Sequence, residues 1–583
     1  MDEAQWVKPR GSASDGLGLR RVPRDRRQKL PESPAAAERR RIRLSNPRRM
    51  KMTNNVNTPA VMLPLKEKDK PIVQKLLSAG CCARCVLRFC CVSVQAAYRQ
   101  AQHETLKELQ TFIMEKENNK VQDSADFKPH DTDLSQTVED PPCKKAKLDP
   151  TEAVQSETDA AAMVTQKKEE SSVCVVCLGI LQDLCGPDQA IKIVETVKAQ
   201  NYEFDTLVLS VSLPAQLCVR EHSCWLHVKK EVRQKGLVLD KDDVIQVKEA
   251  FKWIMQGLVT KQLEGVAVVS KSPFEVGVEF THPDTESDCH FLAKCCPDCF
   301  KPTKNKQSVF TRMAVVKALE KISDVKFLEH YPCPPSEPSG SCTPQDIQCL
   351  HVSVFIAGRY NKFCRSLPQT PWVIDGERRM ESSVEELIAA PILSAFRADG
   401  FNFSSSGRED VDVRTLGNGR PFAMELLNPH RSRFSKVEMK QLQEMINKSS
   451  DKIRVRDLQI VTREAMSRMK EGEEEKTKSY TALVWTQKSI ENEDISFIND
   501  IKDLTLDQKT PLRVLHRRAL AIRQRVIHSM NVRFVDSHHF YLGLKTQAGT
   551  YIKEFVHGDF GRTKPNLCQL LKTDTDILEL DVE

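Results

Sequence analysis

The 583-residue chain contains no apolar run long enough to cross a bilayer, so we expect neither a membrane span nor a membrane partner. The first fifty residues are rich in arginine and lack the apolar segment of a secretory signal peptide. No P-loop and no G-x-G-x-x-G motif follows a strand pattern, so the usual marks of phosphoryl transfer and dinucleotide chemistry are missing. The chain also has no internal repeat.

The composition favours several globular domains, because a chain of 583 residues exceeds the size at which a single core stops growing. Hydrophobic residues make up 40% and charged residues 29%, which is enough to bury a core. The net charge of +7 is too mild to identify a partner. Several of the 20 cysteines stand in C-x-x-C pairs. Because no secretion signal is expected, the compartment is expected to be reducing, and such pairs then indicate metal rather than disulfides.

Changes of composition along the chain predict five segments. Residues 1–61 hold arginine-rich runs with proline, serine and alanine, and are expected to be a disordered basic extension. Residues 62–117 have a helical pattern and carry the first cysteine pair, whereas residues 118–172 are polar with few aromatics and are expected to be a disordered linker. Strands and helices mix in residues 173–345 and again in 346–583, which predicts two α+β domains.

Charged clusters give the only indication of the compartment. Lys144, Lys145 and Lys147 suit a nuclear import signal, although short lysine clusters are common. An arginine-rich start can target mitochondria, but the acids within residues 1–61 weaken that interpretation. The nucleus and cytoplasm are therefore expected, with the mitochondrion as the alternative.

Apolar periodicity and capping signals predict the main elements of both domains. Residues 274–280 (FEVGVEF) alternate, so their four apolar side chains share one face of a strand. Ser382 with Glu385, and Ser435 with Glu438, form capping boxes that predict the starts of two helices. The other predicted elements are strands over 207–213, 350–358, 458–462, 480–486, 525–530 and 540–546, and helices over 220–232, 242–255 and 384–397.

Two C-x-x-C pairs predict a structural zinc site, because four thiolates at this spacing suit tetrahedral zinc. The long gap between the pairs is tolerable, since the entropy of loop closure grows only with the logarithm of loop length. A third pair, Cys296 and Cys299, leaves alternatives open: it could replace one of the others, hold a second metal with Cys295, or act as small buried hydrophobes. The four expected zinc ligands are Cys82, Cys85, Cys174 and Cys177.

Three segments of the C-terminal part form a distinctive set. They are SGREDVDVR (406–414), TKSYTALVW (477–485) and AGTYIKEFVHGDFGR (548–562). The set resembles a pseudouridine synthase, and with KNKQSVFTRMAV (304–315) and the paired cysteines it is similar to the archaeal and eukaryotic tRNA pseudouridine synthases called Pus-ten. The resemblance covers the chain from about Met62 onward. It implies an α+β fold with an N-terminal zinc-containing THUMP-type RNA-binding module and a C-terminal pseudouridine synthase domain, whose sheet is mixed and mainly antiparallel.

The resemblance also implies roles for residues of these segments. Asp410 matches the catalytic aspartate, which acts as nucleophile or general base when the glycosidic bond breaks. Tyr480 matches the tyrosine that stacks on the target base, and Tyr551 lies in the G-T-Y-I segment of the substrate site. Lys553 matches the basic residue paired with the catalytic aspartate, and Arg408 lies where it could fill the space left by a flipped base.

Asp412 is interpreted as an ordinary turn acid. It alternates onto the face opposite Asp410, where it is expected to pair with Arg414. A catalytic carboxylate makes physical sense, because a uracil must leave the RNA stack before it can react and an anion then stabilises the developing positive sugar carbon.

Two basic segments are expected to bind RNA. Residues 508–523 are dense in cations that can follow a phosphate backbone, and the resemblance makes them a thumb-like loop. Residues 370–383 correspond to the opposing forefinger loop, and a solvated charged face is the alternative for either segment. The residues expected to contact RNA are Trp372, Arg378, Arg379, Lys509, Arg513, Arg517, Arg518 and Arg523.

The function that the resemblance implies is isomerisation of uridine in the TΨC arm of tRNA by a monomer, with structural Zn²⁺ and no organic cofactor. The accessory module would grip the acceptor end of the tRNA. The rival interpretation is a zinc-containing RNA-binding adaptor that serves primary microRNA and its processing complex without catalysis. The set of Asp410, Tyr480 and Lys553 favours the enzyme, because an adaptor has no physical need for it.

Overall fold

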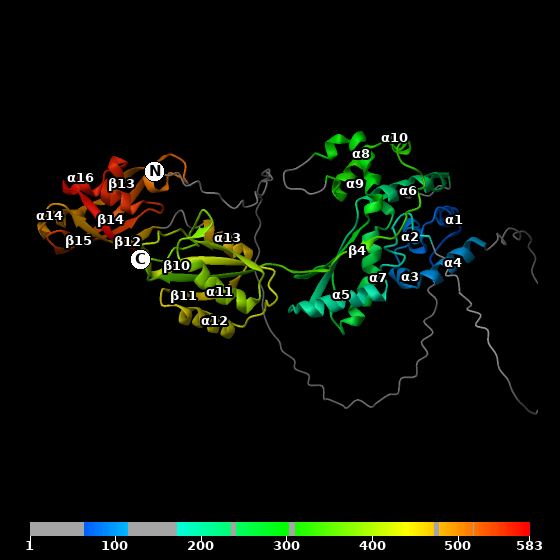
Figure 1. Ribbon diagram of the computed structural model, residues 1–583, viewed down its shortest axis with the longest axis horizontal. Coiled ribbons are helices and arrows are strands. Elements are labelled where there is room, and N and C mark those ends of the chain that lie inside the picture. The colour runs from blue at the N-terminus through cyan, green and yellow to red at the C-terminus, as the bar shows by residue number, and fades with distance from the viewer. Residues whose placement is uncertain (1–62, 115–171, 235–240, 302–308, 472–476, 517) are drawn as a thin grey trace, which may run out of the picture. The chain divides into compact units, whose positions relative to one another are not determined.

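The computed structural model describes residues 63–114, 172–234, 241–301, 309–471, 477–516 and 518–583. The predicted extension (1–61), the predicted linker up to residue 171 and the lysine cluster at 144–147 lie outside these residues. The described residues form two compact units, one of 63–197 with 206–349 and one of 198–205 with 350–583 (Figure 1). Among them, no helix combines the length and the apolar character that a membrane span requires.

Short helices open the N-terminal unit. They are α1 (Lys70–Ser78), α2 (Ala83–Phe89), α3 (Gln95–Arg99) and α4 (Gln102–Met114). The sequence favours a helix start at Pro71, because proline has no N–H to lose in the first turn. Leu76 of α1 and both Val86 and Leu87 of α2 are fully buried, so the helices pack around a common core. The helical pattern predicted for residues 62–117 is confirmed in its described part.

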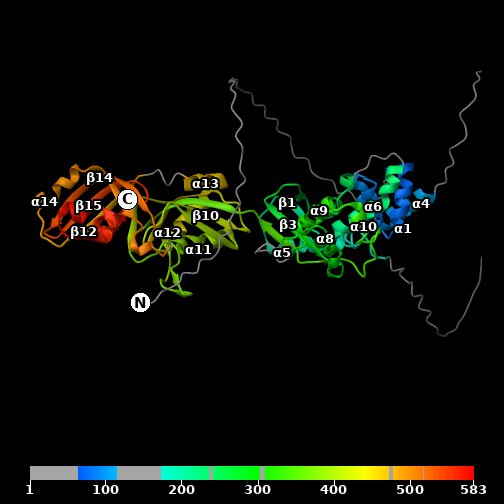
Figure 2. The same ribbon diagram turned by 90° about the horizontal axis from the view of Figure 1, so that it is seen from above.

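A five-stranded sheet with helices completes this unit. Its elements are α5 (Pro187–Gln200), β1 (Thr206–Ser212), α6 (Gln216–Gln234), α7 (Val247–Gln262), β2 (Ala267–Val268), β3 (Phe274–Thr281), α8 (His290–Cys295), α9 (Arg312–Lys321), α10 (Asp324–Leu328), β4 (Thr343–Pro344) and β5 (Gln348–His351). The strand order is β2-β1-β3-β4, with β5 also paired to β3. β1 and β3 lie side by side and parallel (Figure 2), and α6 and α7 supply the crossover that parallel pairing needs. The predicted alternation of 274–280 is confirmed, since every second side chain is buried.

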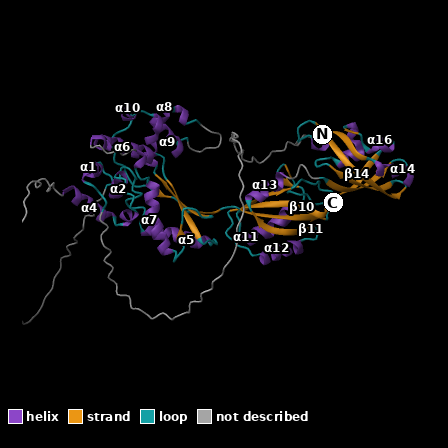
Figure 3. Cartoon of the chain, turned by 180° about the vertical axis from the view of Figure 1, so that it is seen from behind, coloured by secondary structure: helices purple, strands orange, loops and turns teal. Residues whose placement is uncertain are grey.

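The C-terminal unit is built on one ten-stranded sheet, drawn in orange in Figure 3. Its strands are β6 (Val354–Lys362), β9 (Gly400–Ser405), β10 (Val413–Leu427), β11 (Ile453–Val461), β12 (Lys478–Thr486), β13 (Lys502–Lys509), β14 (Ile522–Asp536), β15 (His539–Thr546), β16 (Thr563–Lys564) and β17 (Thr575–Val582). The order is β11-β6-β10-β17-β12-β15-β14-β13-β16, with β9 on β10. Among these described strands only β10 and β17 pair in parallel, so the predicted mixed, mainly antiparallel sheet is confirmed.

Two hydrophobic cores lie along this sheet. The helices of this unit are α11 (Val384–Phe396), α12 (Lys436–Ser449), α13 (Arg463–Glu471), α14 (Asn492–Ser496), α15 (Ile552–His557) and α16 (Leu567–Leu571). A separate hairpin is formed by β7 (Val373–Ile374) and β8 (Glu377–Arg378). One core joins α11 and α12 to β6, β10 and β11 through side chains such as Ile388 and Leu442. The other joins α15 and α16 to β12, β14 and β15 through side chains such as Phe555 and Leu542. The pair β10–β17 connects the two halves of the sheet.

Two predicted boundaries are wrong by small amounts. The capping box at Ser435 is confirmed, but α11 is capped by Ser383, whose hydroxyl accepts the N–H of Glu386 at 3.2 Å, and not by Ser382. The strand predicted over 350–358 is divided between β5 and β6. Sequence patterns identify the type of an element better than its first residue, because capping signals in neighbouring residues compete.

Candidate active site and metal centre

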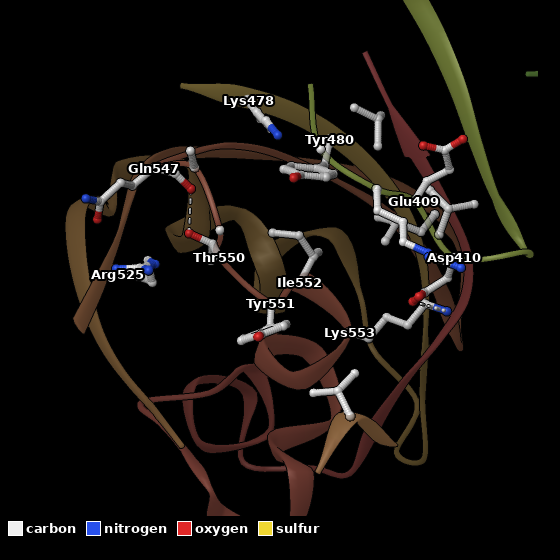
Figure 4. Close-up of a pocket in the computed structure, with 18 of the residues that line it drawn as sticks. Glu409, Asp410, Lys478, Tyr480, Arg525, Gln547, Thr550, Tyr551, Ile552 and Lys553 are labelled. Carbon is white, nitrogen blue, oxygen red and sulfur yellow. Dashed lines mark hydrogen bonds and ion pairs between the residues drawn. The ribbon is translucent and has the colours of Figure 1, made fainter. Parts of the chain in front are cut away.

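A large cavity in the C-terminal unit collects residues from five segments. Its volume is about 1100 Å³, and its lining comes from the β9–β10 loop with β10, the start of β12, the β13–β14 loop with β14, the segment that leads into α15, and the end of β17. Figure 4 shows Asp410 and Lys553 on one side and Lys478, Gln547 and Arg525 on the other. The sheet order explains the convergence, because β17 pairs with both β10 and β12 and so brings their ends together.

Asp410 lies in the turn that leads into β10 and faces two cations. Its carboxylate accepts a hydrogen bond from Nη1 of Arg513 at 2.7 Å, and Nζ of Lys553 lies 3.6 Å away. The side chain of Asp410 is 34% exposed, so a ligand in the cavity can reach it. This arrangement places one accessible carboxylate between two positive charges.

Lys553 is held more closely by Asp412 than by Asp410. Its Nζ donates to both carboxylate oxygens of Asp412, at 2.8 and 2.7 Å. The predicted pairing of Asp412 with Arg414 is wrong, because Arg414 binds Asp581. Residues 411 and 412 form a turn, so the alternation of a strand does not apply to them. Burial acts to raise the pKa of Asp412, but the Lys553 ammonium holds it below its ordinary value.

Arg513 connects Asp410 to a second carboxylate. Its Nε donates to Glu554 at 2.7 Å, and the Glu554 side chain is almost fully buried beside Lys553 at the start of α15. Together with Asp412, these groups form an alternating series of charges: Glu554, Arg513, Asp410, Lys553, Asp412. The guanidinium fork suits such a bridge, because one arginine can serve two carboxylates at once.

Lys362 supports the backbone of the turn that carries Asp410. Its amine is fully buried and donates to the carbonyl oxygens of Leu367 at 2.8 Å, Asp410 at 3.1 Å and Val411 at 2.8 Å. Burial lowers the pKa of this amine to about 8. Three directional hydrogen bonds fix the backbone that presents the Asp410 side chain.

Glu409 anchors the same turn on its other side. Its fully buried carboxylate accepts the Tyr360 hydroxyl at 2.8 and 2.9 Å and lies 2.8 Å from Nε of Arg420. Gln369 donates to the Tyr360 oxygen and to the carbonyl oxygen of Gly407. A buried carboxylate is stable only when it is paired and hydrogen-bonded, and this one is.

The four paired cysteines form a cluster in the N-terminal unit. Their ligand atoms all lie within 4.8 Å of one another, all four side chains are buried, and the sulfurs of Cys82 and Cys177 are 3.8 Å apart. A tetrahedron of sulfurs with metal–sulfur bonds of about 2.3 Å has edges of about 3.8 Å, so the spacing fits. The N–H of Cys82 reaches the sulfur of Cys174 at 3.2 Å, and the N–H of Leu181 reaches that of Cys177 at 3.4 Å. The cluster could therefore hold a metal ion, with Cys85 as the fourth ligand.

The third pair does not join that cluster. Cys296 and Cys299 are half-buried beside the core formed by α8, α9 and α10, and the Cys296 thiol lies 3.7 Å from the carbonyl oxygen of Ala318. In the part of the chain that the structure describes, no group of three or more ligands includes them. Their surroundings suit the interpretation as small hydrophobes.

Two family models match the chain. Residues 355–583 match the model described as "Pus10, C-terminal", and residues 174–349 match "Eukaryotic Pus10, N-terminal". The Mus musculus protein named "tRNA pseudouridine synthase Pus10" is 57% identical over 532 residues, which cover 90% of this chain and 98% of the relative. The chain belongs to the Pus10 family.

Two further comparisons are more distant. The Drosophila melanogaster protein named "Putative tRNA pseudouridine synthase Pus10" is 30% identical over 530 residues, covering 88% of this chain and 96% of the relative. The solved structure titled "Crystal Structure of a Cbf5-Nop10-Gar1 Complex" has a TM-score of 0.23 and 15% identity, and covers 39% of this chain and 47% of that one.

The cavity of this Pus10-family chain gathers most of the predicted site residues and leaves out others. It contains Arg408, Asp410, Tyr480, Arg513, Arg518, Arg523, Tyr551 and Lys553. Lys509 does not line it, and neither do the forefinger residues Trp372, Arg378 and Arg379. Arg378 instead donates to both oxygens of Glu386, at 2.7 and 2.6 Å. Arg517 lies outside the described residues.

Several functional residues were missed from the sequence. Glu409 and Arg420 stand on either side of Asp410 in the same glycine- and arginine-rich stretch. The sequence therefore contained a signal from which an ion pair between them could have been predicted. Glu554 follows Lys553 directly, but nothing in the sequence shows that it is buried. Lys362 carries no signal at all, because a lysine in a strand normally points to solvent.

Proposed function

We propose that the chain is a tRNA pseudouridine synthase in which Asp410 is the catalytic carboxylate. The observation that carries this proposal is the cavity in which the Asp410 carboxylate lies between Arg513 and Lys553, with Tyr480 on the same lining. A relative at 57% identity with the name "tRNA pseudouridine synthase Pus10" supports the substrate class.

The proposed reaction needs a uridine that has left its stack. Flipping a base out of RNA costs a few kcal/mol, and the cavity offers the Tyr480 ring to stack on the base and Arg408 to occupy the vacated space. Asp410 then acts as nucleophile or general base while the bond from uracil N1 to the ribose breaks. The freed uracil turns, its C5 bonds to the same ribose carbon, C5 loses its proton and N1 gains one, so no atoms are gained or lost overall.

The side chains around Asp410 are proposed to hold it in place for this reaction. Arg513 and Lys553 fix the carboxylate from two directions, and Lys362 fixes the backbone behind it. Burial raises the pKa of the Tyr480 hydroxyl, so this ring stays neutral and suited to stacking at ordinary pH. In many enzymes, preorganised charge of this kind makes the largest contribution to the rate enhancement.

The proposed substrate is tRNA, with the modified uridine in the TΨC arm. Residues 173–345 are proposed to be a THUMP-type RNA-binding module that grips the acceptor end, and the four-cysteine cluster is proposed to hold structural zinc. The zinc would join the helical arm, which carries Cys82 and Cys85, to the segment that carries Cys174 and Cys177. A non-catalytic adaptor would have no use for the charge series around Asp410.

The test uses an Asp410→Asn variant and an unmodified tRNA transcript. We expect the variant to fold and to bind the tRNA within about twofold of the wild type, but to form no pseudouridine, because the amide cannot act as nucleophile or base. Asp500→Asn is the matched control, since Asp500 is exposed and does not line the cavity. Turnover by Asp410→Asn would refute the assignment of this residue, and an inactive wild type would refute the proposed function.

A further inference from the structure

Among the cavity arginines that form no ion pair in the described part of the chain, Arg525 is the one whose Nε is buried without a hydrogen-bond partner. It lies on β14, and Nη1 donates to the carbonyl oxygen of its neighbour Gln524 at 2.8 Å. In the described part of the chain, no carboxylate lies within ion-pair distance of it, and Nε has no hydrogen-bond partner. Arg513, in the same cavity, binds two carboxylates. Arg525 is thus a cation that the described residues do not neutralise.

The loop before α15 holds this guanidinium in position. Gly549 has a φ of +78°, and a Cβ there would lie 3.4 Å from Nε and 3.5 Å from Nη2 of Arg525. The loop is closed by the Thr550 hydroxyl, which donates to the carbonyl oxygen of Gln547 at 2.7 Å. Glycine therefore permits both the left-handed turn and the close packing against the arginine.

The charge of the cavity identifies the class of ligand. Eight lysine and arginine residues line its described part, against only two acids, Glu409 and Asp410. Both acids are already paired and lie on the side away from Arg525 (Figure 4). Lys478 and Gln547 lie on the same side as Arg525. Glu554 and Asp412 also pair with two of these cations, so an excess of four positive charges remains. Such an excess in a concave site favours a polyanion, and a guanidinium fork suits phosphate oxygens.

The size of the cavity indicates where that phosphate belongs. About 1100 Å³ exceeds the range of about 300–1,000 Å³ typical of sites for one small molecule, so there is room for more than the target nucleoside. A flipped uridine remains joined to its neighbours, whose phosphates must follow it into the cavity. With the target base beside Tyr480 and Asp410, the side that carries Arg525 is open to a flanking nucleotide.

We propose that Arg525 binds a phosphodiester that flanks the target uridine, and so forms a second subsite in the cavity. This inference rests on the proposed function, because it takes RNA as the substrate. Arg525 acts in binding and not in the bond changes at the target base, since it lies on the other side of the cavity from Asp410. Its loss should weaken RNA binding without slowing the chemical step at saturating RNA.

The test replaces single charged phosphates around the target uridine of a ligated tRNA by neutral methylphosphonates. Full-length wild type is expected to lose about tenfold in affinity at one flanking position, as for a lost charge-assisted hydrogen bond. Arg525→Gln should bind the unsubstituted tRNA about tenfold more weakly and should not respond to the methylphosphonate at that position. Its slope of log affinity against log salt should be lower by about 0.7–0.9, as for one lost phosphate contact.

Matched variants complete the design. Arg533→Gln is the control on the same strand, because Arg533 lies over the Tyr541 ring at 4.4 Å and does not line the cavity. Arg525→Lys keeps the charge and should keep the salt slope. The inference is wrong if Arg525→Gln binds like the wild type, or if each methylphosphonate weakens both proteins equally. Pseudouridine formation by the wild type on the same tRNA separates these outcomes from a failure of the proposed function.

Discussion

The buried amine of Lys362 allows a quantitative test of how the turn that carries Asp410 is held. This side chain is fully buried and donates to three carbonyl oxygens, two of which belong to Asp410 and Val411. No carboxylate among the described residues forms a salt bridge with it, so its hydrogen bonds go to backbone carbonyls, while Glu409, Asp412 and Asp410 act on its charge without contact. The perturbation is Lys362→Met, which keeps the length of the side chain and removes the charge and the three donors.

The expected change in the free energy of unfolding follows from the pKa of Lys362. Burial lowers that pKa from 10.5 to about 8, so the folded protein releases this proton before the unfolded chain does. Between these two values the unfolded state binds more protons, and stability therefore rises with pH. At about 1.36 kcal/mol per pH unit, the wild type should gain about 2 kcal/mol relative to Lys362→Met between about pH 7 and pH 9.5.

Denaturant unfolding of the full chain at both pH values measures this difference. Lys545→Met is the matched control, because Lys545 is an exposed strand lysine and its variant should follow the wild type. If the free energies of unfolding of wild type and Lys362→Met change in parallel to within about 0.5 kcal/mol, Lys362 does not titrate in this window and the reasoning is refuted. At neutral pH the variant should also lose about 100-fold in kcat, because a shift of about 1 Å misplaces the reactive carboxylate.

Two other predictions concern the charge series and the cysteine cluster. Arg513→Gln should lower the single-turnover rate about tenfold, with a smaller change in KM, and Arg513→Lys should restore only part of it, because an ammonium cannot bridge Asp410 and Glu554 as a fork does. A rise in KM at an unchanged rate would instead make Arg513 an RNA contact alone. Cys82→Ala should lose zinc in metal analysis, since binding at such sites is worth about 10–16 kcal/mol and needs all four ligands. Cys299→Ala should keep its zinc, and undiminished zinc in Cys82→Ala would remove the metal proposal.

Features that repeat along the chain could be predicted from the sequence. The alternation of residues 274–280 and the strand at 480–486 were identified, because a half-buried strand needs an apolar residue at every second position. The cysteine cluster was also predicted with its members, since a C-x-x-C pair places two sulfurs on one side of a short turn. Such patterns depend on the local geometry of the backbone and not on the contacts between distant segments in the folded chain.

The pairing of charges could not be predicted in the same way. The sequence indicated that Lys553 approaches Asp410, but a turn of two residues brings Asp412 closer to that amine. Arg513 looked like one of several cations in an RNA loop, and only the fold places Glu554 beside it. The pairing of acids and cations depends on distances of a few ångströms between three segments that are far apart in the sequence. Secondary-structure propensities carry no information about these distances.

The resulting series of charges has a physical consequence for the carboxylate at its centre. Asp410 shares each of its cations with another acid, Arg513 with Glu554 and Lys553 with Asp412. Lys553 comes from the start of α15, which is packed on the sheet, whereas Arg513 comes from the β13–β14 loop. Any displacement of that loop must therefore change the charge facing Asp410 while the pair of Lys553 and Asp412 stays in place. Because the same loop carries Arg518 into the cavity, the contacts proposed to bind RNA and those that hold Asp410 cannot be independent.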